Sequence, residues 1–180
     1  MNAEIDITNV TLQTERLILR PWTVDDLADF YEYASVDGVG QMAGWLPHKN
    51  IDESLAILQM FIAEKKVFAI EFDGKVIGSL GIEFYKEELL PEYKTKQGRE
   101  IGYALSKNYW GKGLMPEAVK TVIKYLFETV NLDFIVCSHF LKNVQSKRVQ
   151  EKCGFKHYKL IKYTTYYGEV KDAWLSLLER

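Results

Sequence analysis

The sequence predicts a mixed α/β fold in which one central β-sheet carries helices on its faces. Two observations predict it. Runs of β-branched and aromatic residues alternate with amphipathic helical segments, in the order βααβββαβαββ. A glycine-containing turn at residues 110–115 also connects a short strand to the most regular helical pattern of the chain. Because no linker or internal repeat interrupts this order, residues 1–180 are expected to form a single domain.

The first part of the chain is predicted to contain a strand and two helices. Residues 16–20 read as a short strand, which ends at a proline. Thr23 and Asn50 are helix-capping residues, and each is followed three positions later by an acidic residue and then by an apolar stripe. The two expected helices are therefore separated by a glycine-containing loop, residues 36–49.

The rest of the chain alternates between strands and helices. The pair Asp73-Gly74 predicts a hairpin turn, and Tyr167-Gly168 predicts another. The expected elements are strands at 68–72 and 76–84, an exposed polar loop at 86–99, a strand at 100–105, a helix through 118–130, a strand at 134–140, a short helix at 144–153 and strands at about 155–166 and 170–178.

Composition limits the class of protein. Hydrophobic residues make up 47% of the chain, which predicts a globular protein, and the net charge of -2 gives no electrostatic reason to expect nucleic acid as a partner. No apolar run approaches the roughly 20 residues of a membrane span, and the start of the chain lacks a signal-peptide pattern. The two cysteines have no metal-ligand spacing. We expect a cytoplasmic monomer or homodimer without a metal or membrane contact.

The glycine turn is the strongest chemical signal. Gly111 and Gly113 allow a tight turn, and Pro116 fits the first turn of the helix that follows. Free N–H groups at a helix start, with the positive end of the helix dipole, suit a phosphate. The pattern matches neither the Walker motif nor the dinucleotide fingerprint. Glycines of this kind can also serve only to turn the chain, so the turn alone leaves both interpretations open.

Several separated segments together point to a family. These segments are residues 14–22 (Thr-Glu-Arg-Leu-Ile-Leu-Arg-Pro-Trp), 100–105 (Glu-Ile-Gly-Tyr-Ala-Leu), 110–118 (Trp-Gly-Lys-Gly-Leu-Met-Pro-Glu-Ala), 143–146 (Asn-Val-Gln-Ser) and 151–155 (Glu-Lys-Cys-Gly-Phe). In this order they resemble the GNAT superfamily of acyl-coenzyme A-dependent N-acyltransferases, and most closely its RimJ/RimL-type branch of ribosomal-protein N-acetyltransferases. The resemblance covers nearly the whole chain.

The resemblance implies acetyl-coenzyme A (acetyl-CoA) as the cofactor. It implies that the backbone of the glycine turn holds the pyrophosphate, although Trp110 and Met115 depart from the general family pattern. It also implies a splayed sheet, with the pantetheine arm between the strands at 100–105 and 134–140. The implied cofactor-binding residues are Tyr103, Ala104, Leu105, Trp110, Gly111, Lys112, Gly113, Leu114, Met115, Asn143 and Ser146. Lys112, Lys147 and Arg148 are further candidates for phosphate contacts.

Acetyl transfer needs a base for the amine, a donor to the thioester oxygen and a proton for the leaving thiolate. Glu100 is the first candidate for the base and Glu83 the reserve, although glutamates at strand ends are often simply solvated. A backbone N–H near Leu105 is the candidate oxyanion donor. Ser146 matches a serine that donates a proton in RimL-like enzymes, but a serine three residues after Asn143 is also typical of a capped helix.

The acceptor side is the least determined. Candidates that line an acceptor pocket are Trp45, His48, Glu83 and Tyr85, although aromatic residues are more often part of a core. The expected reaction is direct attack of a primary amine on acetyl-CoA in a ternary complex. A protein N-terminus such as that of a ribosomal protein is the favoured acceptor, with a small-molecule amine as the other option. A non-catalytic CoA-binding module, or an enzyme using another acyl-CoA, remain alternatives.

Overall fold

A computed structural model describes residues 1–180 and places all eight strands in one sheet of order β1-β2-β3-β4-β5-β6-β8-β7. Four α-helices and five short 3-10 turns join them. The strands are β1 (Leu12–Gln13), β2 (Ile18–Pro21), β3 (Val67–Phe72), β4 (Lys75–Glu83), β5 (Gly98–Leu105), β6 (Phe134–Phe140), β7 (Lys156–Thr164) and β8 (Val170–Glu179). The helices are α1 (Leu27–Ala34), α2 (Ile51–Glu64), α3 (Leu114–Glu128) and α4 (Val144–Lys152). The mixed α/β architecture is confirmed.

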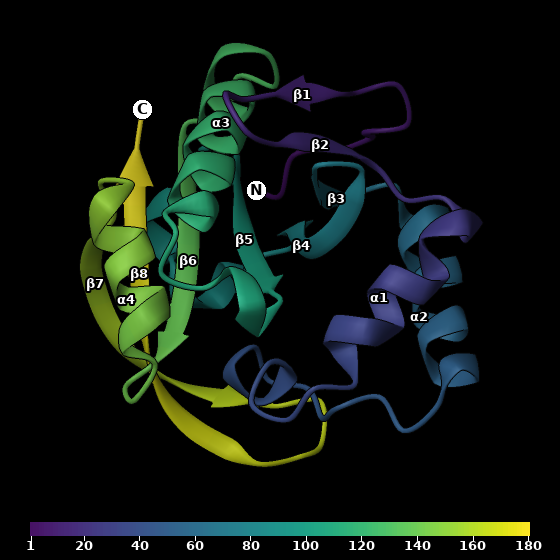
Figure 1. Ribbon diagram of the computed structural model, residues 1–180. Coiled ribbons are helices and arrows are strands. Elements are labelled where there is room, and N and C mark those ends of the chain that lie inside the picture. Colours follow the sequence, from purple (N-terminus) through teal and green to yellow (C-terminus); the bar gives the residue numbers. More distant parts are fainter.

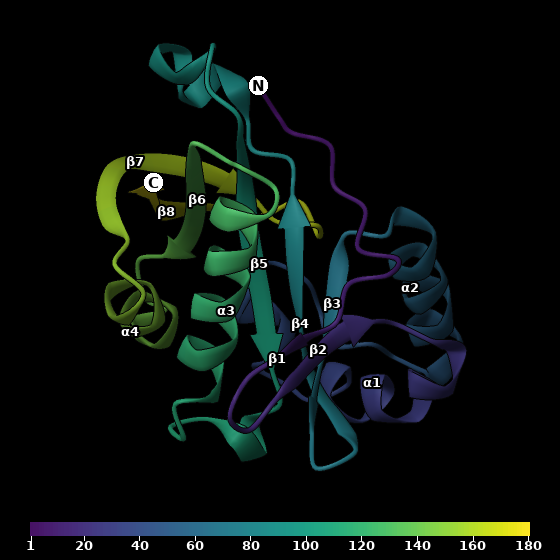
Figure 2. The same ribbon diagram turned by 90° about the horizontal axis from the view of Figure 1, so that it is seen from above.

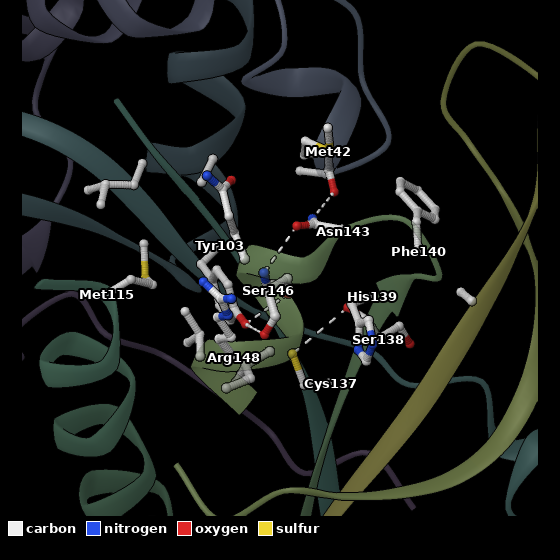
Figure 3. A pocket seen from close by; sticks show the side chains of 18 of the residues that line it. Met42, Tyr103, Met115, Cys137, Ser138, His139, Phe140, Asn143, Ser146 and Arg148 are labelled. Carbon is white, nitrogen blue, oxygen red and sulfur yellow. Dashed lines mark hydrogen bonds between the residues drawn. The ribbon is translucent and has the colours of Figure 1, made fainter. Parts of the chain in front are cut away.

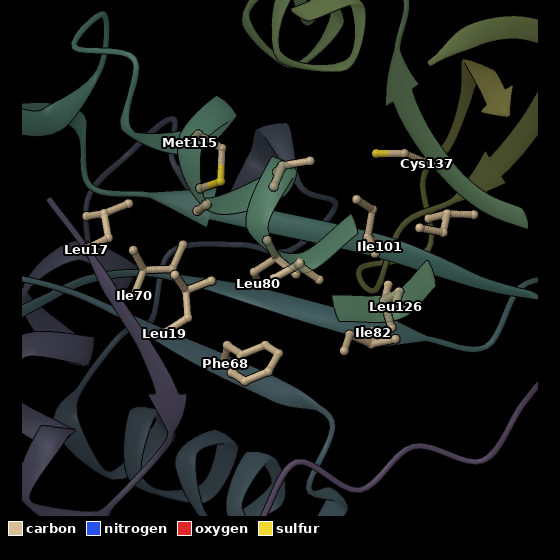
Figure 4. Packing of buried hydrophobic residues seen from close by; sticks show 14 of the residues in the cluster. Leu17, Leu19, Phe68, Ile70, Leu80, Ile82, Ile101, Met115, Leu126 and Cys137 are labelled. Atoms are coloured by element: carbon tan, nitrogen blue, oxygen red, sulfur yellow. The ribbon is translucent and has the colours of Figure 1, made fainter. Parts of the chain in front are cut away.

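Helices cover both faces of the sheet (Figures 1 and 2). Strand β3 shows why, because its successive side chains point to opposite faces and both are buried. Phe68 and Ile70 belong to the cluster that α3 covers, which Figure 4 shows with Leu80 and Leu126. The alternate residues of the strand join the cluster formed by α1 and α2. None of the helices is long and apolar enough to cross a membrane.

Capping residues and a turn lie where the sequence predicts them. Thr23 forms a capping box with Asp26, although the chain makes a 3-10 turn there before α1 begins at Leu27. The Asn50 side chain accepts a hydrogen bond from the backbone N–H of Glu53 at 2.9 Å and so caps α2. Both residues of the predicted Asp73-Gly74 turn adopt positive φ values, 49° and 77°, as a tight hairpin turn requires.

The sheet opens between β5 and β6, the only parallel pair. Their register contains only the residue pairs from Gly98–Phe134 to Glu100–Val136. Beyond these pairs, β5 continues to Leu105 on β4, while β6 continues to Phe140 on β8. The two strands diverge, as Figure 2 shows, and the sheet is splayed as predicted.

Two expectations about the start of β5 were wrong. The strand begins at Gly98 rather than residue 100, because Gly98 pairs with Phe134. A Cβ on this glycine would lie 2.3 Å from the Phe134 ring, so only glycine fits the contact. Residues 86–99 are also not simply an exposed loop, since Leu90 is buried in a cluster with Tyr85 and Phe134. The two-residue strand β1 was not predicted from the sequence.

Candidate active site

A cleft of about 730 Å³ lies where β5 and β6 diverge. One end is lined by the glycine turn and the first turn of α3, and by α4. The other end is lined by Glu83, Phe84 and the β7–β8 hairpin. Figure 3 shows side chains of β5, β6 and α4 pointing into this space. The cleft is thus long, open to solvent and formed by the break in the sheet.

The backbone of β5 presents polar groups to the cleft. The N–H of Ser106 donates to Ile77 of β4 at 2.8 Å, so by the two-residue period the peptide groups of Ala104 also face β4. Those of Tyr103 and Leu105 face the open side, where no strand pairs with them. Of the three predicted residues, Tyr103 offers its backbone N–H and C=O to a ligand and Leu105 its N–H, whereas Ala104 only lines the cleft.

The glycine turn is built for close approach of a ligand to the backbone. Gly111 and Gly113 have φ values of 75° and 76°, a conformation that side chains disfavour, and both line the cleft. The indole N–H of Trp110 donates to the Leu105 carbonyl at 2.7 Å, which ties the turn to the end of β5. This contact accounts for tryptophan at a position where the general family pattern has another residue.

Cations gather at the same end of the cleft. Arg148 and Lys152 lie four residues apart on α4 and both line it. Of the other predicted phosphate contacts, Lys112 lies over the Tyr109 ring and Lys147 lies 3.8 Å from Glu151, and neither lines the cleft. Lys152 was missed, although its spacing from Arg148 on one helix face could have indicated it.

These features fit the ligand that the resemblance implies. The open edge of β5 offers backbone donors and acceptors to a pantetheine amide. The start of α3 offers free N–H groups to a pyrophosphate, and Arg148 and Lys152 add positive charge. The residues present therefore suit acetyl-CoA, an elongated anionic molecule.

Two carboxylates face the cleft at its other end. Glu83 and Glu100 are opposite each other in the β4–β5 register, so their side chains lie on the same face. Glu100 accepts a hydrogen bond from the Ser138 hydroxyl at 2.8 Å, and Glu83 lies 2.6 Å from the ammonium of Lys66. Burial raises the pKa of Glu100; the bond from Ser138 opposes the rise and the charge of Glu83 adds to it. The Glu100 carboxylate is thus a stronger base than an exposed glutamate.

Ser146 lies at the start of α4 and lines the cleft (Figure 3). Its hydroxyl is 3.0 Å from that of Tyr103 and 3.4 Å from the side-chain nitrogen of Gln150. Burial raises the pKa of Tyr103 well above its ordinary value, so this phenol stays protonated and can donate to Ser146.

The orientation of Gln150 follows from its other partners. Its side-chain oxygen is 2.9 Å from Nδ1 of His139, and its nitrogen donates to the sulfur of Cys137 at 3.1 Å. Its N–H groups therefore point toward Ser146 and Cys137. Gln150 therefore donates to the Ser146 oxygen, and when Tyr103 also donates to it the Ser146 proton is free for a group in the cleft.

Asn143 has two structural roles. Its side-chain oxygen accepts from the backbone N–H of Ser146 at 3.0 Å and caps α4. Its side-chain nitrogen donates to the carbonyl of Met42 at 3.1 Å, in the loop between α1 and α2. Asn143 lines the cleft and connects the start of α4 to this loop.

The structure does not bring all of the predicted acceptor residues to the cleft. Glu83 lines it, whereas Trp45, His48 and Tyr85 do not. His48 is buried, with Nδ1 2.7 Å from the hydroxyl of Ser54, and its ring lies 5.3 Å from that of Trp45. Tyr85 packs edge-on against Phe134 in a separate cluster.

Other residues, which were not predicted from the sequence, line the acceptor end of the cleft instead. They are Met42, Phe84, Lys86, Tyr163 and Tyr166. The backbone N–H of Tyr166 donates to the Gly44 carbonyl at 2.8 Å, so the β7–β8 hairpin meets the α1–α2 loop beside the cleft. Segments more than 100 residues apart build this wall, and no local sequence signal marks it.

The comparisons with known proteins agree with this geometry. The acetyltransferase (GNAT) domain matches residues 16–156. The uncharacterized N-acetyltransferase p20 of Bacillus licheniformis is 29% identical over 180 residues, covering 94% of this chain and 97% of that protein. A GNAT-family acetyltransferase structure from Bacillus anthracis has a TM-score of 0.81 at 22% identity and covers 94% of this chain and 98% of that one.

A structure of RimJ from Mycobacterium smegmatis in complex with CoA-disulfide has a TM-score of 0.75 at 21% identity. It covers 94% of this chain and 87% of that one. The family match extends over most of the chain, and the splayed sheet and glycine turn are in place. The chain belongs to the GNAT family and is an acyl-CoA-dependent N-acetyltransferase that uses acetyl-CoA.

Proposed function

We propose that this enzyme acetylates the α-amine of a polypeptide N-terminus, with Glu100 as general base and Ser146 as proton donor. The observation that carries the proposal is that Glu100, whose pKa is raised by burial, lines the same cleft as Ser146 of α4. The two groups come from different elements, β5 and α4, so the two proton transfers of the reaction can be assigned to separate residues.

Acetyl-CoA supplies the thioester that the amine attacks and the thiolate that departs. Glu100 takes the proton that the amine loses, and the raised pKa of this carboxyl suits that task. The N–H of Leu105 faces the open side of β5 and is the proposed donor to the thioester oxygen. Ser146 donates its proton to the departing sulfur and regains one from Tyr103, which is 3.0 Å away.

The mouth of the cleft supports a polypeptide acceptor. Phe84 and Tyr166 line it and are 59% and 83% exposed, so aromatic surface is available beside the acceptor end. Glu83 and Glu100 both line this end, where their carboxyl oxygens can accept hydrogen bonds from an amine. The resemblance of the sequence to the RimJ/RimL-type branch of ribosomal-protein N-acetyltransferases also favours a protein acceptor.

A comparison of acceptors tests the proposal. The kcat/KM for acetyl transfer is measured with peptides bearing a free α-amine, with the same peptides blocked at the N-terminus but carrying a lysine, and with free amino acids and polyamines. We expect the free-α-amine peptides to be preferred by at least tenfold. Equal or higher kcat/KM for a small amine would overturn the polypeptide assignment and leave the acetyltransferase activity intact.

A further inference from the structure

The turn between β1 and β2 contacts the glycine turn from outside the cleft. Figure 2 shows it beside the start of α3. Arg16 donates from Nη1 to the carbonyl of Lys112 at 3.0 Å. Its Nε and Nη2 also lie 2.8 and 2.7 Å from one carboxylate oxygen of Glu117. One arginine therefore bridges the glycine turn and the first turn of α3.

The contact is reinforced by the backbone of the same turn. The other oxygen of Glu117 accepts from the Thr14 hydroxyl at 2.5 Å and from the N–H of Arg16 at 2.9 Å. Burial raises the pKa of Glu117, but the bonds from Thr14 and Arg16 outweigh it, so the net pKa lies below its ordinary value. Glu117 is therefore a carboxylate with both oxygens engaged.

The bond to Lys112 orients the turn. The C=O of Lys112 and the N–H of Gly113 belong to one trans peptide and point in opposite directions. Because Arg16 holds the carbonyl on its own side, the N–H of Gly113 is directed away from Arg16. Gly113 lines the cleft and Arg16 does not. The arginine therefore fixes, from outside the cleft, an N–H donor for a ligand inside it.

The ion pair has an electrostatic consequence as well. Glu117 lies in the first turn of α3, where a carboxylate is attracted to the same helix terminus as a ligand phosphate and repels that phosphate. Arg16 neutralises the carboxylate and turns both of its oxygens toward the β1–β2 turn. The positive N-terminal end of α3 is then available to bind the phosphate of the ligand.

We infer that Arg16 is a positioning residue for acetyl-CoA: it fixes the amide donors of the glycine turn and neutralises Glu117 beside the pyrophosphate. This inference rests on the proposed placement of the pyrophosphate at the glycine turn. It assigns a role in cofactor binding to a residue on the opposite side of that turn from the cleft, about 100 positions away in sequence.

A mutant cycle measured by calorimetry with CoA tests the inference without knowledge of the acceptor. Arg16→Ala should weaken CoA binding roughly tenfold. Glu117→Gln alone should leave the Kd within about threefold, because the neutral amide repels no phosphate. In the double variant Arg16→Ala/Glu117→Gln the affinity for CoA should recover in part, because the Glu117 carboxylate that Arg16→Ala leaves without its partner is replaced by a neutral amide. A merely structural role would leave the double variant as weak as Arg16→Ala or weaker.

Arg16→Lys provides the conservative comparison, because it keeps the charge but lacks the planar fork that joins Lys112 and Glu117. Its CoA affinity should lie between those of the wild type and Arg16→Ala, and it replaces Arg16→Ala in the cycle if that variant does not fold. Gly113→Ala separates this inference from its premise. Unchanged CoA binding in Gly113→Ala would reject the placement of the pyrophosphate. Weakened binding there, with unchanged binding in the Arg16 variants, would reject only the role of Arg16.

Discussion

At the scale of single residues, the site depends on what surrounds two ordinary side chains. Burial raises the pKa of Glu100, the proposed base, and the hydroxyl of Ser138 limits that rise. The Ser146 hydroxyl, the proposed proton donor, lies within hydrogen-bond distance of the Tyr103 hydroxyl and of the side-chain nitrogen of Gln150. A substitution of a neighbouring residue can change the surroundings of Glu100 or Ser146 while leaving these two side chains in place.

Ser138→Ala should move the acid limb of the pH–rate profile to higher pH. The Ser138 hydroxyl stabilises the charged form of Glu100, so its removal raises the pKa of this carboxyl further. The base form is then lost at a higher pH as the solution is acidified. The profile of kcat/KM against pH for wild type, Ser138→Ala and Ser138→Thr measures the effect, with Ser138→Thr close to wild type. An unmoved limb, or one moved to lower pH, would show that Glu100 is not the group that titrates.

Gln150→Leu should lower kcat roughly fivefold, the cost of one lost hydrogen bond of about 1 kcal/mol, with the KM for acetyl-CoA unchanged. The physical reason is that Ser146 loses the donor that helps to orient it. The decisive comparison is the same substitution on a Ser146→Ala background, where it should have little further effect on kcat. An equal loss on both backgrounds would mean that Gln150 acts independently of Ser146.

The sequence pointed to Glu100, Asn143 and Ser146, because these residues lie in recognisable segments. It did not indicate Ser138 or Gln150, whose importance comes from contacts across the splay and between α4 and β6. Such partners depend on the tertiary packing of separate elements. No spacing within one element encodes them.

At the scale of elements, the site exists because β5 and β6 pair over a short stretch and then separate. Gly98 begins this pairing and lies against the ring of Phe134, in a cluster that includes Tyr85 and Leu90. The fixed end of the splay is therefore a tightly packed contact between a glycine and an aromatic ring.

Gly98→Ala should destabilise the protein by about 1–3 kcal/mol, because the added methyl group would overlap the buried Phe134 ring. Gly102→Ala is the matched control, since it lies in the same strand and its Cβ would meet no atom within 4 Å. Chemical denaturation of the two variants measures the difference in free energy of unfolding. Equal stability of the two variants would contradict the packing described at the base of the splay.

Local signals account for how well the elements were predicted. Helix caps at Thr23 and Asn50 and the Asp73-Gly74 turn depend on neighbouring residues, and all three were found where expected. Residues 86–99 were predicted to be exposed because their composition is polar. The burial of Leu90 there results from packing against Phe134, a contact that composition does not reveal.

At the scale of the whole molecule, the two ends of the cleft are built differently. The cofactor end is formed by two segments, the glycine turn with the start of α3 and the start of α4, and each segment is a short continuous stretch of sequence with a recognisable pattern. The acceptor end is formed where the α1–α2 loop meets the β7–β8 hairpin, through the bond from Tyr166 to Gly44. This difference explains why the sequence predicted the cofactor and left the acceptor open.

The most direct test of the account is acetyl transfer to a free-α-amine peptide by the wild type and by Glu100→Gln, with CoA binding measured in parallel. The account predicts acetylation at the α-amine by the wild type. It predicts a kcat about 10²–10⁴ lower in Glu100→Gln, with CoA affinity unchanged. A variant that acetylates the peptide at the wild-type rate, or a wild type that acetylates small amines but no peptide, would contradict the account.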